Sequence, residues 1–165
     1  MGVLDDFMVN SDISLLEKTR IQAQVLVPVM QALRAELGRE KADAIVRKAL
    51  RDWSSRMFAE IGKGIEGSPG RKFARMNRAL EDVTVKEVTF EVHRRDPEAL
   101  EFDVTSCRFA EFFRASGEPE LGALLVCATD IDIAAAGGDD VSFSREQTLM
   151  KGGPSCTFRY KFAPR

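Results

Sequence analysis

The stretch from Phe102 to Phe162 contains many side chains that could do chemistry. All three cysteines of the 165-residue chain fall within it. Arginines and carboxylates accompany them. A guanidinium can bind a carboxylate through two parallel hydrogen bonds, and a carboxylate can bind an amidine or move a proton. The members of this set are Cys107, Cys127, Cys156, Arg108, Arg145, Arg159, Glu111, Glu120, Asp130 and Asp132.

The cysteines are candidate nucleophiles, because a thiolate adds readily to an electrophilic carbon. Cys107 stands beside Arg108 at a predicted junction between a strand and a helix. A neighbouring arginine and helix-start amides would both lower the pKa of its thiol. The competing interpretation is that all three cysteines are buried small hydrophobic residues, as free cysteines usually are.

Glu111 and Asp130 are the candidate acid/base or amidine-binding groups, because each lies within four residues of a cysteine. The competing interpretation is that they are solvated charges on helices. Two or three thiolates with Asp130 could also bind a metal ion, although the long and unequal gaps match no zinc motif. We predict neither a metal nor a cofactor. The single histidine, His93, is predicted to lie on a strand surface.

Short segments follow one another in a characteristic order: Cys107-Arg108-Phe109-Ala110-Glu111, Pro119-Glu120-Leu121-Gly122, Cys127-Ala128-Thr129-Asp130, Arg145-Glu146-Gln147-Thr148 and Cys156-Thr157-Phe158-Arg159. In that order and at those separations, the series resembles the L-2-amino-thiazoline-4-carboxylic acid hydrolase family. Such a hydrolase opens a thiazoline ring at C2 and releases an N-carbamoyl cysteine. The resemblance implies catalytic roles for Cys107, Cys127, Glu111 and Asp130, and substrate-binding roles for Arg108, Arg145, Arg159, Thr148 and Cys156.

One position departs from the family pattern. The family commonly ends its last motif Cys-Asp-Phe-Arg, whereas this chain has Thr157 in the second position. A threonine hydroxyl carries no charge at neutral pH, so an essential carboxylate would be missing. The alternative to a small hydrolase acting on a C–S or C–N bond is therefore a non-catalytic module that binds or senses an organic acid. A third alternative, a protein-interaction scaffold, predicts no ligand-sized pocket.

Two of the arginines could form a cradle for the substrate carboxylate. Arg159 lies on the face of the last strand opposite to Cys156, Phe158 and Tyr160. If the amino-terminal helices cover the apolar face, residues 108–136 should cover the face of Arg159, and Arg145 would converge there. Structural ion pairs of both arginines with acids of the covering segment are the competing expectation.

Helical patterns precede these motifs. Ser14 and Glu17 have the spacing of a capping box, and Gly38 is placed to end the helix that begins there, with a kink expected at Pro28. A second helix is predicted for residues 39–61, a glycine-rich loop for 62–70 and a short third helix after it. The residues expected to face the core are Ile21, Val25, Leu26, Val29, Met30, Leu33 and Leu37 of the first helix, Ala42, Ile45, Val46, Ala49, Leu50, Trp53 and Met57 of the second, and Phe73, Met76 and Leu80 of the third.

After Glu81 the apolar residues alternate instead. Strands are predicted around 88–93 and 100–104, joined in a hairpin, and at 141–150 and 155–162, with helices over 108–116 and from Pro119. The predicted class is α+β, with the amino-terminal helices packed on an antiparallel sheet of about four strands. We expect one domain over residues 1–165, made of a loose arm (1–13), a helical part (14–80) and a sheet part with the site (81–165). The order of elements also resembles four-vinyl-reductase-type small-molecule sensor domains.

The composition of the chain limits the classes of partner that we expect it to bind. The net charge is −2 and the pI is about 5.6, which disfavours nucleic acid and anionic membrane surfaces. The first residues lack the features of a secretory signal, and the longest apolar run is far too short for a membrane span. Reduced cysteines and a cytoplasmic location are expected. The expected partner is a small cyclic carboxylic acid as substrate, and self-association into a homo-oligomer stays open.

Overall fold

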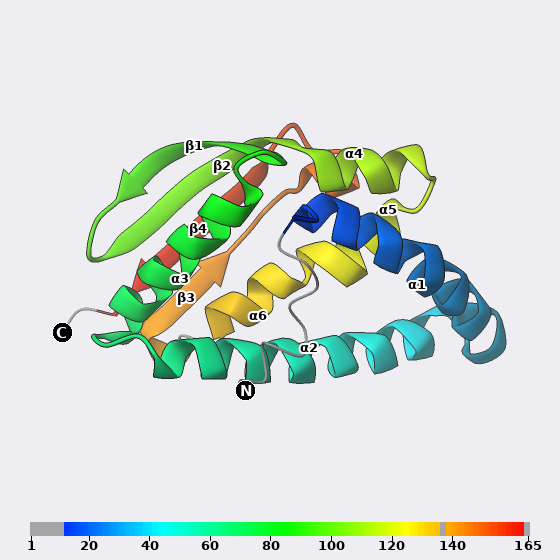
Figure 1. The fold of residues 1–165 in the computed structure, drawn as a ribbon, viewed down its shortest axis with the longest axis horizontal. Helices are drawn as coiled ribbons and strands as arrows, with labels where there is room; N and C mark the ends of the chain where they lie inside the picture. Colours follow the sequence, from blue (N-terminus) through cyan, green and yellow to red (C-terminus); the bar gives the residue numbers. More distant parts are fainter. Residues whose placement is uncertain (1–11, 136–137, 164–165) are drawn as a thin grey trace.

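The computed structural model describes residues 12–135 and 138–163. Helices come first and an antiparallel sheet follows, so the predicted α+β class is confirmed (Figure 1). The predicted arm over residues 1–13 lies outside the described residues, apart from its last two positions. The elements are α1 (Leu15–Leu37), α2 (Arg39–Lys63), α3 (Pro69–Thr84), β1 (Val88–Arg95), β2 (Ala99–Cys107), α4 (Arg108–Ala115), α5 (Pro119–Gly122), the π-helical turn η1 (Ala123–Cys127), α6 (Thr129–Ala135), the 3₁₀ turn η2 (Gly138–Asp140), β3 (Val141–Ser144), the 3₁₀ turn η3 (Leu149–Lys151) and β4 (Cys156–Phe162).

Local signals in the sequence set the helix boundaries. The hydroxyl of Ser14 accepts a hydrogen bond from the backbone N–H of Glu17 at 3.2 Å, as predicted. Gly38 follows α1 with a φ of 78°, in the region that glycine enters without steric cost. Ser68 caps α3 in the same manner as Ser14 caps α1. The glycine-rich loop is shorter than predicted, because α2 and α3 extend into it from both sides.

The sheet has four antiparallel strands in the order β1-β2-β4-β3, which confirms the predicted strand number. β1 and β2 form the predicted hairpin. Asp96 Oδ1 closes the hairpin turn by accepting hydrogen bonds from the backbone N–H groups of Glu98 and Ala99, at 2.8 and 2.9 Å. Because β4 lies between β2 and β3, its first residue, Cys156, comes to lie opposite Val104, three residues before the end of β2.

The strand predicted over residues 141–150 is only partly right. β3 ends at Ser144, and an irregular segment leads to the turn η3. The hydroxyl of Thr157 accepts a hydrogen bond from the backbone N–H of Glu146 at 3.0 Å, and the N–H of Thr157 donates to the carbonyl of Gln147 at 3.3 Å. The Thr157 hydroxyl thus replaces the regular backbone hydrogen bonds between strands and holds the segment after β3 against β4.

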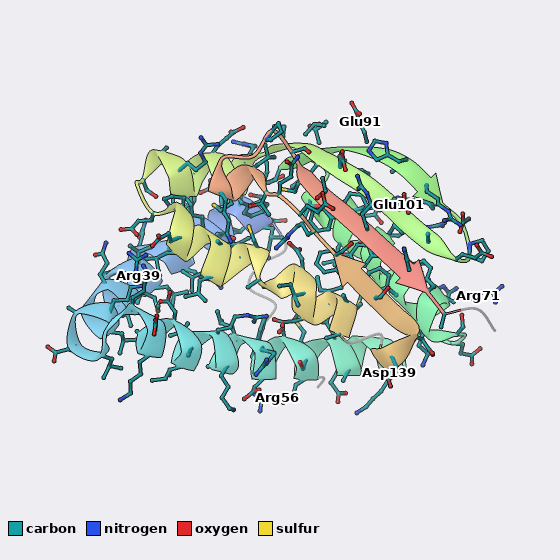
Figure 2. All side chains as sticks on the ribbon, turned by 180° about the vertical axis from the view of Figure 1, so that it is seen from behind. Arg39, Arg56, Arg71, Glu91, Glu101 and Asp139 are labelled. Carbon is teal, nitrogen blue, oxygen red and sulfur yellow. The ribbon has the colours of Figure 1, made fainter. Side chains whose placement is uncertain are left out.

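The helices that contact the sheet pack against one of its faces. Core residues of α2, α3 and α6 share a cluster with the apolar side of β2 and β4. The prediction that residues 108–136 cover the other face is wrong, because Ile133 and Ala134 of α6 join this same cluster. Figure 2 shows the sheet from the other side, with β4 in front and no described helix over the strands. The cluster consists of Phe58, Phe73, Met76, Leu100, Phe102, Val104, Ile133, Ala134, Val141, Cys156, Phe158, Tyr160 and Phe162.

The predicted core stripe of α1 points in the wrong direction. Ile21, Val25 and Val29 are exposed, although Met30, a residue of the same predicted stripe, is buried. Ala23, which lies outside the predicted stripe, is buried in a small cluster that also includes residues of α4. Helical spacing identifies an apolar stripe but not which side of the helix meets the rest of the protein. On α2, likewise, Ile45 and Trp53 are partly exposed, and the buried side chains are Ala42, Ser54 and Phe58. No described helix is long and apolar enough to cross a membrane.

Candidate functional site

Three segments that are distant in the sequence meet at the guanidinium of Arg145, just after β3. Its Nη1 donates to Oδ2 of Asp130 at 2.5 Å, and its Nη2 donates to the carbonyl of Cys127 at 3.0 Å. The guanidinium also lies 5.3 Å from the ring centroid of Phe158 and 5.8 Å from that of Phe143. The Arg145 side chain is only 11% exposed, so these contacts hold it in one orientation.

A π-helical turn presents Cys127 and Asp130 to this guanidinium. Within η1 the hydrogen bonds reach five residues back, and the N–H of Ala128 bonds to the carbonyl of Ala123 at 3.0 Å. Single π-helical turns redirect the side chains that follow them, and they are frequent at functional sites. Here the turn separates α5 from α6, so Cys127 lies at its end and Asp130 in the first turn of α6.

Asp130 titrates close to neutral pH. Burial raises the pKa of its carboxyl from 3.8 to about 6, against the opposing effect of the Arg145 guanidinium. Solvent still reaches 30% of the side chain, so we attribute the shift to the surrounding low-dielectric protein and not to complete exclusion of water. A carboxyl with such a pKa can both take up and release a proton at neutral pH, as a general base or acid must.

The three thiols lie around the same pair, and none is a thiolate at rest. Burial raises the pKa of Cys127 to about 12, and it also raises the pKa values of Cys107 and Cys156. Backbone amides at the start of α4 lower the pKa of Cys107 without offsetting its burial. The expectation of a lowered thiol pKa at Cys107 is therefore wrong, because burial outweighs the effect of these amides and Arg108 is exposed.

A cleft of about 960 Å³ opens beside Cys127 and Arg145, a volume within the range of small-molecule sites. One wall comes from α5, η1 and α6, and another from the loop after β3. A third comes from α1 and α2, where Arg34 and Asp43 form two parallel hydrogen bonds at 2.7 and 2.8 Å. Asp130, Cys107 and Cys156 are not part of the lining, and Asp130 adjoins it through Arg145.

Two threonines order the loop that carries Arg145. Thr148 is buried, lines the cleft and caps η3 by accepting a hydrogen bond from the N–H of Lys151 at 3.3 Å. Thr157 holds Glu146 from the side of β4 opposite to Cys156. An aspartate at position 157 would offer a carboxylate oxygen to the same amide, so the departure from the family pattern preserves an acceptor at this position.

Other predicted site residues lie elsewhere. Arg108 and Glu111 are exposed on α4 and do not line the cleft. Arg159 forms an ion pair with Asp103 at 2.7 Å on the uncovered face of the sheet, where His93 lies 3.3 Å from the same carboxylate. The predicted convergence of Arg159 with Arg145 is therefore wrong, because the two side chains lie on opposite faces of β4. Each arginine forms an ion pair instead, Arg145 with Asp130 and Arg159 with Asp103.

The contribution of α2 to this region is absent from the sequence motifs. Asp132, only 2% exposed, accepts hydrogen bonds from both terminal nitrogens of Arg47, at 2.9 and 2.6 Å, and one from the hydroxyl of Ser54 at 2.9 Å. This network ties α6 to α2. The only sequence signal for it is that Arg47 and Ser54 are seven residues apart and so share one face of a helix.

The acid Glu120 also has a structural role. It pairs with Arg39 at 2.8 Å across the mouth of the cleft. Among residues 12–135 and 138–163, no group of three or more histidine, cysteine, aspartate and glutamate side chains could hold a metal ion.

Comparison with known proteins supports the assignment of both fold and family. The phenol-responsive sensory domain of the transcription activator PoxR, in its crystal structure with phenol, is similar to this chain with a TM-score of 0.51. Sequence identity is 17% over 83% of this chain and 72% of that chain, which shows a shared fold alone. A search of curated proteins finds no match. The family model described as L-2-amino-thiazoline-4-carboxylic acid hydrolase matches residues 18–160. Because the match spans nearly the whole chain, this protein belongs to the L-2-amino-thiazoline-4-carboxylic acid hydrolase family.

Proposed function

We propose that this protein is a hydrolase that opens a small cyclic amidine-like carboxylic acid at the C–S bond of its ring. The observation that carries the proposal is the Asp130–Arg145 pair beside Cys127 at the wall of a ligand-sized cleft. The family match makes a 2-amino-thiazoline-4-carboxylate the first substrate to test. In such a substrate the reacting carbon, C2, is bonded to two nitrogens and to the ring sulfur.

Water activated by Asp130 accounts for the chemistry better than a cysteine nucleophile does. Moving a proton from the Cys127 thiol, whose pKa is about 12, to Asp130, whose pKa is about 6, would cost about 8 kcal/mol at 1.36 kcal/mol per pKa unit. The pKa values of the other two thiols are also raised. Asp130 is mostly ionised at neutral pH, and 30% of its side chain is exposed, so solvent water can reach the carboxylate.

The reaction then needs one proton acceptor that later becomes a donor. The Asp130 carboxylate takes one proton from the water as the water oxygen forms a bond to C2 and the electrons of the C2–N double bond move onto that nitrogen. The nitrogen takes up the second proton of the water as the C2–O double bond forms. The C2–S bond breaks, the sulfur leaves with the bonding electrons, and the Asp130 carboxyl returns the proton to it. The product is an N-carbamoyl cysteine with a free thiol. Arg145 positions the carboxylate through the 2.5 Å hydrogen bond and lowers its pKa, which keeps it ionised before the reaction.

The substrate carboxylate needs a cation that is not already paired. Arg34 and Arg39 line the cleft but are bound to Asp43 and Glu120. Lys151 lines the cleft, is exposed and forms no ion pair within the part of the chain that the structure describes. We assign it to the carboxylate, and Lys151→Met should raise KM with little change in kcat, because it removes an interaction of the bound substrate.

The direct test is to incubate the purified protein with L-2-amino-thiazoline-4-carboxylate and to measure new thiol in filtered samples, which excludes the protein's own cysteines. We expect release of one thiol per substrate consumed, and formation of N-carbamoyl cysteine by mass spectrometry. Asp130→Asn should slow the release by at least about 10²-fold, whereas Asp139→Asn, which removes an exposed carboxylate of η2, should not slow it. Absence of release at high enzyme concentration would exclude this substrate.

The alternative is a module that binds an organic acid without converting it. The observation that favours it is the shared fold with a sensory domain that was crystallised with phenol. In a thermal-shift screen of small carboxylic acids and phenols, a binding module would be stabilised in proportion to the logarithm of ligand concentration. Stabilisation by an acid that stays chemically unchanged after prolonged incubation would favour this alternative over the hydrolase.

A further inference from the structure

The outer side of α1 exposes a continuous apolar surface. Val25 is 63% exposed, Ile21 55% and Val29 47%. Figure 1 shows the α1–α2 hairpin projecting away from the sheet, so this side of α1 does not face the sheet. Contiguous apolar patches on soluble proteins usually mark a site of interaction. The buried residues Ala23 and Met30 lie on the opposite side of the same helix and already account for its packing within the chain.

The outward-facing side of α1 is symmetric about residue 27, one position beyond the midpoint of the helix. At about 100° per residue, Lys18, Val25, Val29 and Glu36 all fall within a strip roughly 40° wide. The two valines flank residue 27 at equal distance, and so do Lys18 and Glu36. A second copy of α1, antiparallel to the first, would therefore place Val25 against Val29, and Lys18 against Glu36, at both ends of the contact.

We propose that α1 forms the interface of a two-fold symmetric dimer, with a second copy of this chain as the partner. A two-fold interface requires that a surface be complementary to itself, and this strip carries opposite charges at its ends and apolar residues at its centre. Neither Lys18 nor Glu36 forms an ion pair within residues 12–135 and 138–163, so both are available to a partner. An unrelated partner would not require the two halves of the strip to match.

The contact is modest in size. A helix of 23 residues is about 34 Å long, and a single pair of such helices lies at the low end of protein interfaces. We therefore expect dissociation constants on the order of 10–100 μM, a reversible association. Dimer formation would leave the cleft open, since α1 contributes Arg34 to it from the side that faces α2.

The first experiment is sedimentation equilibrium of the full chain over a wide concentration range. We expect a monomer–dimer equilibrium that Val25→Glu weakens at least tenfold. The matched control is Gln24→Glu, which adds the same charge to the neighbouring exposed position about 100° around the helix and should change the dissociation constant less than twofold. Circular dichroism and the melting temperature verify that both variants remain folded. A wild-type monomer at every concentration, or equal effects of the two variants, would overturn the proposal.

The second experiment tests the symmetry itself. Lys18→Glu and Glu36→Lys should each weaken self-association by several-fold, because like charges then meet at both ends of the contact. When the two variants are mixed, each end of the mixed dimer pairs a glutamate with a lysine, so association should return to the wild-type level. A mixture that associates no better than either variant alone would show that the charges do not meet across a two-fold axis.

Discussion

Replacing Asp130 with asparagine should remove the pH dependence that the Asp130–Arg145 pair confers on activity. With a pKa of about 6, roughly a tenth of the carboxyls are ionised at pH 5 and about nine tenths at pH 7. The kcat/KM of the wild-type protein should therefore rise about tenfold over this range and level off above it. Asp130→Asn should lower the rate about 10²- to 10⁴-fold, the usual contribution of a general base, and abolish this rise.

The position of the rise depends on Arg145. Its guanidinium lowers the pKa of Asp130, so Arg145→Gln should move the rise to higher pH. The assay is thiol release from L-2-amino-thiazoline-4-carboxylate in buffers of constant ionic strength, with every sample brought to one pH before thiol detection. If the substrate itself titrates, the pH profiles of kcat/KM shift equally for all variants. A difference between the profiles of the wild type and Arg145→Gln therefore reports on the protein group alone.

The titration of Asp130 should also make the free energy of unfolding depend on pH, which can be measured without an activity assay. The Asp130 carboxyl ionises near 3.8 in the unfolded chain and near 6 in the folded one, so the folded state binds more protons between these values. The free energy of unfolding should therefore fall as the pH rises from about 4 to about 6, by up to about 3 kcal/mol. Urea unfolding measures this, and Asp130→Asn should lose that component.

Two results would refute this reasoning. A flat rate profile between pH 5 and 7 would show that Asp130 is not the titrating base. If the rise occurs at the same pH in Arg145→Gln as in the wild type, another group of the protein, or the substrate, causes it.

Three further variants test the other groups around the site. Cys127→Ala should keep kcat within about tenfold of the wild-type value if water is the nucleophile, and a loss of several orders of magnitude would instead identify Cys127 as the nucleophile. In the wild-type protein, the Cys127 thiol should react with iodoacetamide at pH 8 about 10³-fold more slowly in the folded than in the unfolded chain, because its pKa in the folded chain is about 12. Asp132→Ala should lower the free energy of unfolding by about 3–5 kcal/mol, measured in urea, because it leaves the guanidinium of Arg47 without its buried partner. Gly122→Ala should lower the free energy of unfolding by about 1–3 kcal/mol, since the new Cβ would lie 2.6 Å from both Met150 Sδ and Phe113 Cγ. An unchanged melting temperature would show that both side chains move aside at no cost.

Features that depend on neighbouring residues could be predicted from the sequence. The cap at Ser14, the hairpin turn at Asp96 and the alternation in β4 are each settled within a few residues, so local hydrogen bonds and steric preferences suffice to specify them. The ordered motifs also pointed to the family and grouped Cys127, Asp130 and Arg145, which the fold brings together.

Features that depend on which surfaces meet were decided by the tertiary structure. The apolar stripe of α1 could be recognised, but its burial depended on which side of α1 packs within the chain. The sequence distinguishes the two faces of β4. It does not show that one face remains uncovered and that Arg159 pairs there with Asp103. The pKa values of the thiols and of Asp130 follow mainly from burial, and burial is set by segments far apart in the chain. Local sequence carries no information about this burial. The motifs therefore offered Glu111 and Asp130 alike as acid/base candidates, and only the folded chain favours Asp130, whose pKa is raised by burial.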